Sequence, residues 1–223
     1  MNRLEQKGII VGMLLGDASL NLPNKKGRNG TSHGKSKNWR LSITHCEEQR
    51  DYLKWKGDLL GKITSIRYDD FIGGYKKNRN YRLTTRCHPI YTKIAERMYI
   101  DGRKTFDNHI LSTLNTKGLA IWYMDDGYLR VDKKVSELST CSFTYPEHYL
   151  LRKMMWDKFG LSTTIHRKGK YYRLYIRRTS MDLFLKLVYP HITEVKSMLY
   201  KVRTKEPEKA RYSLNPLVTM GNK

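Results

Sequence analysis

The chain of 223 residues has few cysteines and no long apolar run. Cys46, Cys87 and Cys141 are too few and too scattered for a disulfide framework or a paired-cysteine metal site, which favours a reducing compartment. No apolar stretch approaches the roughly 18–20 residues that cross a bilayer, and we expect no secretion leader. The apolar fraction of 39% is nevertheless enough to build a core, which argues against a disordered basic chain.

Acidic residues are scarce as well, because 21 Asp and Glu stand against 43 Lys and Arg, a net charge of +22. Such a surplus repels itself in a compact chain, and binding to a polyanion relieves the repulsion. A membrane surface would require a basic amphipathic helix or a lipidation signal, and we find neither. Residues 1–107 and 108–223 each carry +11, so nucleic-acid contact is predicted along the whole chain rather than in a basic tail.

The two halves of the sequence repeat one order of predicted elements. Each opens with an apolar run that ends in an acid, continues into an amphipathic helix, and then has a hairpin with the related segments YRLTTR and YRLYIR and a further apolar helix. This order predicts an α+β fold of two pseudo-symmetric αββαββα halves. We assign residues 1–107 to the first half, 108–203 to the second and 204–223 to a tail, with a linker near 101–117 and a loop at 21–37.

The predicted strands place an apolar face against the helices and leave a polar face free, since alternate residues of a strand point to opposite sides. Arginine, rather than mixed charge, dominates the polar face in both halves, which favours DNA contact over an ordinary solvated sheet. The candidate DNA-binding residues are Arg40, Ser42, Thr44, Arg67, Arg82, Thr84, Arg86, His166, Lys168, Lys170, Arg173, Tyr175 and Arg177.

The two apolar runs end in Asp17 and Asp126, and this placement is unfavourable for isolated helices. A carboxylate at a helix C-terminus faces the negative end of the helix dipole, which costs roughly 0.3–1 kcal/mol. One such acid is a common turn residue, but two at matching positions of a repeat indicate a compensating cation. Gly12 and Gly16 would let two such helices pack closely and bring both carboxylates to one end, where they would hold Mg²⁺ or a similar ion.

These two runs carry a family resemblance. Ile10–Ala18 and Leu119–Gly127 match the two nine-residue motifs of the double-motif LAGLIDADG homing endonucleases, with Asp17 and Asp126 at the acidic eighth position. The second motif and the MLYK segment at 198–201 are most similar to yeast mitochondrial members of that family. The resemblance covers about residues 8–203, and it departs from the family pattern at Gly16 and Ala18.

The resemblance implies saddle-shaped antiparallel sheets in the DNA major groove and the two motif helices as the interface between the halves. It implies a monomeric, metal-dependent endonuclease that makes a staggered double-strand break in a long asymmetric DNA site. Asp17 and Asp126 would bind Mg²⁺ or Mn²⁺ with the backbone carbonyls of Gly16 and Asp125. Lys104 and Lys201 occupy the places of the family's catalytic basic residues, and together with Asp17 and Asp126 they form the catalytic set that the resemblance implies.

Two other functions stay open at this point. Members of this family also act as intron RNA maturases, and others bind DNA specifically without cutting it. The presence of both acids argues against a non-cleaving binder but does not exclude a maturase with intron RNA as a partner. The expected location is intracellular, in a mitochondrial matrix or in a bacterial or phage-infected cytoplasm.

Overall fold

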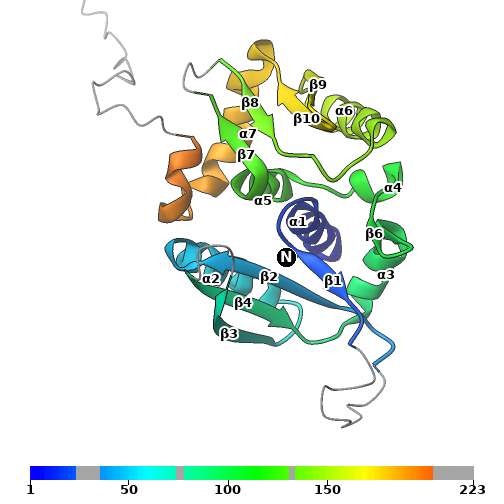
Figure 1. The fold of residues 1–223 in the computed structure, drawn as a ribbon, viewed down its shortest axis with the longest axis vertical. Coiled ribbons are helices and arrows are strands. Elements are labelled where there is room, and N and C mark those ends of the chain that lie inside the picture. Colours follow the sequence, from blue (N-terminus) through cyan, green and yellow to red (C-terminus); the bar gives the residue numbers. More distant parts are fainter. Residues whose placement is uncertain (24–35, 74–77, 131–133, 203–223) are drawn as a thin grey trace, which may run out of the picture.

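The computed structural model describes residues 1–23, 36–73, 78–130 and 134–202. The predicted tail at 204–223 and most of the predicted loop at 21–37 lie outside these residues. The expected α+β fold is confirmed: two αββαββα units with antiparallel sheets follow one another in the chain (Figure 1).

The elements of the two units correspond one to one. The first unit contains α1 (Arg3–Leu15), β1 (Ser19–Asn21), β2 (Arg40–Cys46), α2 (Arg50–Gly61), β3 (Ile66–Gly73), β4 (Asn78–Thr85) and α3 (Pro89–Met98). The second contains α5 (Thr116–Asp126), β7 (Gly127–Leu129), β8 (Ser136–Leu138), α6 (Tyr145–Phe159), β9 (Thr163–Lys168), β10 (Tyr171–Ile176) and α7 (Met181–Ile192). Between them lie β5 (Tyr99–Ile100), β6 (Arg103–Lys104) and α4 (Asn108–Leu111), and short 3₁₀ turns are η1 (Glu47–Gln49), η2 (Arg178–Ser180) and η3 (Lys196–Lys201).

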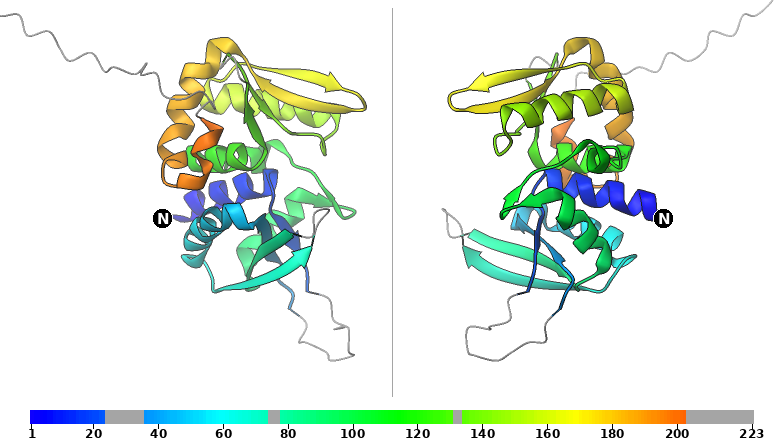
Figure 2. Two further views of the ribbon diagram at one scale, coloured as in Figure 1. Left: turned by 60° about the vertical axis from the view of Figure 1, so that its left-hand side comes forward. Right: turned by 90° about the vertical axis from the view of Figure 1, so that its right-hand side faces the viewer.

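Each unit has its own four-stranded antiparallel sheet, ordered β1-β2-β4-β3 in the first and β7-β8-β10-β9 in the second. The segments YRLTTR and YRLYIR therefore begin in equivalent inner strands, β4 and β10. The alternation predicted for β2 is confirmed, since Leu41, Ile43 and His45 are buried and the residues between them are partly exposed. The β3–β4 and β9–β10 hairpins extend from the same side of the molecule, as Figure 2 shows in both views.

Helices α1 and α5 pack against each other at the centre of the molecule (Figure 1). Every residue from Gly8 to Leu15 and from Gly118 to Met124 is buried, as expected for helices that are apolar all round. A Cβ atom at Gly12 would overlap the backbone of Gly118, and a Cβ at Gly118 would overlap the carbonyl oxygen of Gly8. The two backbones thus touch directly, at Gly12 and Gly118.

Local signals explain where several helices begin and end. Asn2 and Glu5 form a capping box at the start of α1, and Thr144 and Glu147 form another at the start of α6. Gly160 ends α6 at φ +66°, in the left-handed region where glycine carries no steric penalty.

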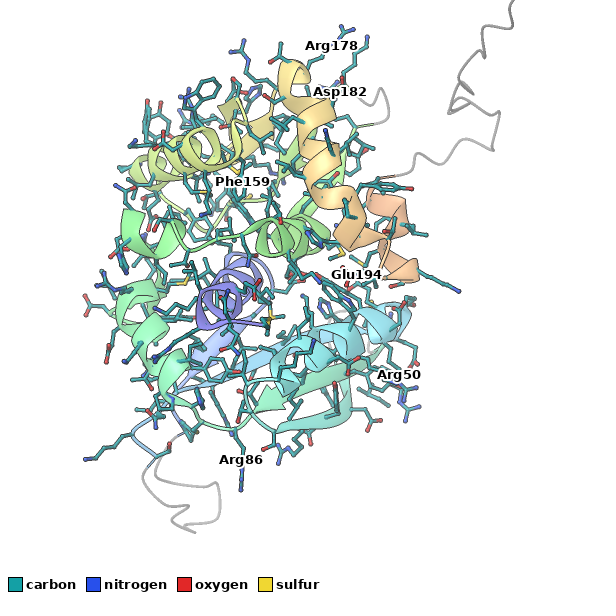
Figure 3. All side chains as sticks on the ribbon, turned by 180° about the vertical axis from the view of Figure 1, so that it is seen from behind. Arg50, Arg86, Phe159, Arg178, Asp182 and Glu194 are labelled. Carbon is teal, nitrogen blue, oxygen red and sulfur yellow. The ribbon has the colours of Figure 1, made fainter. Side chains whose placement is uncertain are left out.

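A polar cluster joins the two units on the face seen in Figure 3. Glu194, labelled there, follows α7 and lies beside α2 of the first unit. Its carboxylate accepts hydrogen bonds from Trp55 Nε1 at 3.0 Å and from Lys117 Nζ at 3.2 Å. Helices α2, α5 and α7 are therefore linked at one point, in addition to the apolar contact between α1 and α5.

Within the described residues, no helix is both long enough and apolar enough to cross a bilayer.

Candidate active site

Asp17 and Asp126 lie at corresponding ends of the two central helices. Helix α1 ends at Leu15 with Gly16 as its C-terminal cap, so Asp17 follows the helix directly, while Asp126 is the last residue of α5. The helices pack side by side, and the charge of Asp17 is, after burial, the next cause that raises the pKa of Asp126. The structure thus brings together the two acids that the sequence singled out.

The two lysines expected near the acids lie in matching positions. Lys104 Nζ donates to the carbonyl oxygens of Gly16 at 3.3 Å and Ala18 at 3.0 Å. Lys201 Nζ donates in the same way to the carbonyl oxygens of Asp125 at 3.4 Å and Gly127 at 2.7 Å. Each ammonium group therefore bridges the residues before and after one acid, at the negative end of one helix dipole.

The crowding of charge changes how these groups titrate. Burial, and then repulsion from Asp17 and Asp125, raise the pKa of Asp126 to about 7. The pKa of Asp17 is raised as well, by burial and by the charge of Asp125. Burial lowers the pKa values of Lys104 and Lys201, although the nearby carboxylates oppose the shift. The lysines only partly offset the negative charge, so the site favours an additional cation.

The carboxylate of Asp125 has a different environment, which we did not predict. It forms an ion pair with Lys56, with Nζ 2.6 Å from Oδ1, and both side chains are fully buried. Tyr52 donates its hydroxyl to the same oxygen at 2.9 Å, and the backbone amide of Asp17 donates to Oδ2 at 3.1 Å. Both oxygens of Asp125 are thus hydrogen-bonded inside the protein.

His45 completes this group on strand β2. Its Nε2 lies 3.1 Å from Lys56 Nζ, and because an ammonium group is only a donor, Nε2 accepts and Nδ1 carries the proton. Nδ1 lies 3.9 Å from Oδ2 of Asp17. Burial and the charge of Lys56 lower the pKa of His45 to about 4, so the ring is neutral near pH 7.

The donor atoms fit a divalent metal at Asp17 and Asp126 better than at Asp125. Ligand atoms of Asp17, His45 and Asp125 lie within 4.8 Å of one another, but Asp125 already holds Lys56 and Tyr52 and so has no need of a cation. Asp17 and Asp126 have raised pKa values, which a bound cation would reverse. Their carboxylates are also the hard oxygen ligands that Mg²⁺ and Mn²⁺ prefer.

A polar groove runs from Asp17 across the first sheet. It has a volume of about 420 Å³, and nine side chains of the sheet line it together with Asp17. They are Ser19, Asn21, Arg40, Ser42, Thr44, Arg67, Asp69, Arg82 and Thr84. Six of the seven candidate DNA-binding residues of the first half therefore share this groove.

Two candidates of the first half, Thr84 and Arg86, differ from the others in their surroundings. Thr84 is only 7% exposed, because it sits in the middle of the sheet between Ser42 and Arg67, and it is poorly placed to reach a ligand. Arg86 follows β4 and lies outside the groove, at the outer edge of the sheet in Figure 3. The groove also contains Asp69, an acid that the sequence analysis did not consider and that pairs with Arg67 at 3.0 Å.

The second sheet presents its candidates in the equivalent place. Arg173 pairs with His166 and Tyr171 with Lys168 across β9 and β10, so these side chains share the face of Tyr175. The rings of His166 and Tyr175 stack at 4.1 Å between centroids, and Arg173 forms an ion pair with Glu137. Lys170 lies in the turn between the two strands and Arg177 just after β10, both exposed.

Comparison with known proteins decides the family. The LAGLIDADG DNA endonuclease family matches residues 7–184, well over half of the chain. The chain belongs to this family.

The curated proteins that this chain resembles are of several kinds. The cytochrome b mRNA maturase bI2 of Debaryomyces hansenii is 30% identical over 206 residues, which cover 89% of this chain and 73% of the maturase. The DNA endonuclease I-ChuI of Chlamydomonas applanata is 26% identical over 219 residues, 89% of this chain and 94% of that protein. The protein RecA of Mycolicibacterium flavescens is 30% identical over 213 residues, 89% of this chain; the chain spans only 46% of that protein, less than half.

Solved LAGLIDADG structures support the fold. The homing endonuclease I-WcaI bound to its DNA recognition sequence superposes with a TM-score of 0.71 at 20% identity, over 90% of this chain and 86% of that one. I-DmoI in complex with DNA and Mn gives 0.52 at 16% identity, over 84% and 97%. At these sequence identities, both similarities show a shared fold.

Sequence reasoning missed the buried group around the Asp125 carboxylate. The family motif drew attention to the backbone of Asp125, not to its side chain. Lys56 was one of 43 basic residues and carried no motif. Its only signal is position: it lies four residues after Tyr52 on the buried face of α2, where a charged residue needs a partner.

Proposed function

We propose that this protein is a homing endonuclease that hydrolyses both strands of a long, asymmetric double-stranded DNA site and leaves a staggered break. The observation that carries the proposal is the pair of acids at the packed ends of α1 and α5. Each acid is flanked by a lysine on its neighbouring carbonyl groups, and a polar, arginine-bearing sheet begins beside it. A single chain supplies both halves of the site, which supports action as a monomer.

The residues of the site have separate roles in this proposal. Asp17 and Asp126 bind divalent ions, Mg²⁺ or Mn²⁺, with the carbonyl groups of Gly16 and Asp125 as further ligands. Such an ion, when bound, stabilises charge on the scissile phosphate and acidifies a water molecule. Lys104 and Lys201 place a positive charge next to each acid, where it stabilises the negative charge that develops on the phosphate. No side-chain nucleophile is required.

The sheets hold the DNA in this proposal. Arg40, Arg67 and Arg82 in the first groove, and the arginines and His166 of the second sheet, are suited to guanine edges and phosphates. The pairing of Arg173 with Glu137 fixes the direction of its guanidinium before DNA arrives. I-WcaI and I-DmoI, which share the fold, are both known in complex with DNA, and this supports the same partner here.

Cleavage of a plasmid library with randomised inserts tests the proposal. We expect linear product with Mg²⁺ and none with EDTA, and sequencing of the ends would give the target site. Asp126→Asn should still bind the selected site but fail to cut at least one strand. Lys54→Met, a substitution at an exposed position of α2, is the matched control and should cut normally. Double-strand cleavage by the asparagine variant at the wild-type rate would refute the assignment of the acid.

A second candidate function is RNA maturation, which the similarity to the maturase of Debaryomyces hansenii favours. A maturase would promote splicing of its intron RNA in vitro, and the two activities can coexist in one protein. Splicing without any DNA cleavage would favour the maturase, while cleavage without splicing would favour the endonuclease.

A further inference from the structure

The buried group around Asp125 belongs to only one side of the pseudo-symmetric site. Asp125 comes from the second half, whereas its partners Lys56 and Tyr52 come from α2 of the first half. The Lys56–Asp125 pair thus crosses the boundary between the halves, with both side chains 0% exposed. A buried charge pair of this kind is costly to form and needs a reason beyond stability.

The second half has apolar residues at the matching positions. Counting back from Gly61 and Gly160, which mark the ends of α2 and α6, Met155 corresponds to Lys56 and Leu151 to Tyr52. Both are fully buried. Gly16, the counterpart of Asp125 in the first motif, has no side chain, and a Cβ atom there would overlap the Asp125 carboxylate. The fold therefore accepts apolar side chains at these helix positions in the second half, whereas the first half has Lys56 and Tyr52 there.

The consequence of the charge pair falls on Asp17. Asp17 lies beyond the end of α1, and its backbone amide donates to Oδ2 of Asp125. Asp126 differs, because it is still within α5 and its backbone is held by its own helix. The position of one metal-binding candidate thus depends on a side chain from the opposite half, and the position of the other does not.

We propose that Lys56 and Asp125 are positioning residues that hold the backbone of Asp17 and make the two halves of the active site inequivalent. Lys56 fixes the Asp125 carboxylate, Asp125 fixes the Asp17 amide, and the Asp17 carboxylate is placed through its own backbone. Tyr52 supports the same carboxylate. The inference rests on the proposed endonuclease function, and it predicts that loss of the pair slows cleavage of one DNA strand much more than the other.

The experiment uses the full chain and its selected target, with each strand carrying a different label. The main variant is Lys56→Met with Asp125→Ala, which removes both charges together and keeps α5 helical through Asp126. We expect target affinity in EDTA to stay within about threefold, cleavage of one strand to slow at least about tenfold, and cleavage of the other to change by less than about threefold. Lys54→Met on the same helix is the control and should cleave both strands at wild-type rates.

Two further variants keep the test decisive if the double variant is poorly folded. Tyr52→Phe removes one hydrogen bond to Asp125 at almost constant volume and should slow the same strand, by a smaller factor. In thermal unfolding without metal, Lys56→Met and Asp125→Ala alone should each lower Tm more than the double variant does, since each leaves a single charge buried.

The possible outcomes separate the inference from the function on which it rests. If the wild-type protein cuts neither strand with Mg²⁺, the endonuclease proposal fails and the inference fails with it. If the wild type cuts both strands and the variants slow both equally, or neither, only the positioning role is refuted.

Discussion

The raised pKa of Asp126 makes a quantitative prediction about the metal-free protein. A carboxyl group whose pKa moves from 3.8 to about 7 on folding destabilises the ionised fold by roughly 4 kcal/mol, at about 1.4 kcal/mol per pKa unit. Because Asp126 is partly exposed, solvent screening reduces this by about half, to about 2 kcal/mol. The sign follows from the direction of the shift: the penalty is absent below pH 4, grows as pH rises, and is complete above pH 7.

Asparagine at position 126 resembles the protonated acid, so Asp126→Asn should escape this penalty. In EDTA, wild type and variant should unfold at similar temperatures near pH 4.5. At pH 8 the variant should unfold about 4–8 °C higher, from about 2–4 °C per kcal/mol for a chain of this size. The assay is thermal unfolding followed by circular dichroism at a series of pH values.

Two results would refute the reasoning. A difference in Tm that does not change with pH would show that Asp126 titrates normally, and a variant less stable at pH 8 would show that the carboxylate is stabilising. Addition of Mg²⁺ at pH 8 gives an independent check, since it should raise the Tm of the wild type more than that of the variant.

The remaining predictions concern the contact between α1 and α5, the hydrogen bonds of Glu147 to the segment that carries Lys104, and the DNA surface. Gly12→Leu should prevent correct docking of α1 on α5 and lower Tm by more than 10 °C, which corresponds to a loss of several kcal/mol of stability. The control is Gly61→Ala, whose Cβ would have its nearest neighbour at 3.8 Å, and its Tm should stay within about 2 °C of the wild-type value. Glu147 Oε1 accepts hydrogen bonds from Arg103 and Thr105 at 2.5 Å and so holds the segment that carries Lys104, and Glu147→Ala should lower the cleavage rate about tenfold with target affinity kept. Thr144→Ala, which removes one hydrogen bond to the other oxygen of this carboxylate, should lower the rate much less. Lys168→Ala and Arg177→Ala should each weaken DNA binding at low salt and reduce the slope of log Kd against log salt by about one, and unchanged slopes would remove these residues from the phosphate contacts.

The fold was accessible from the sequence because its signals are local and repeated. Each signal depends on a few neighbouring residues, as in the alternation of β2, the capping glycine after α6 and the two apolar motif helices. Because the sequence is repeated, the order of elements in one half supports the same order in the other. Asp17 and Asp126 were accessible for the same reason, since an acid at the end of a buried helix is unusual in itself.

The buried group was not accessible, because it depends on contacts between distant parts of the chain. Lys56 and Asp125 are 69 residues apart in sequence, and the sequence around each residue does not indicate which residue it pairs with. The packing of Gly12 on Gly118 has the same origin, since it depends on how two helices that are distant in sequence dock on each other. Thr84 shows the limit of alternation, which gives the side of a sheet but not how deeply the neighbours cover it.

The cross-boundary pair has a consequence for the exchange of halves between relatives. The glycine contact between α1 and α5 is made by backbone and would accept many partners. Lys56 and Asp125 would not: a first half joined to a partner without the acid would bury a lone ammonium group, and a second half duplicated into a dimer would place Asp125 beside Met155. Chimeras and symmetric dimers built from this chain should therefore either keep both Lys56 and Asp125 or replace both.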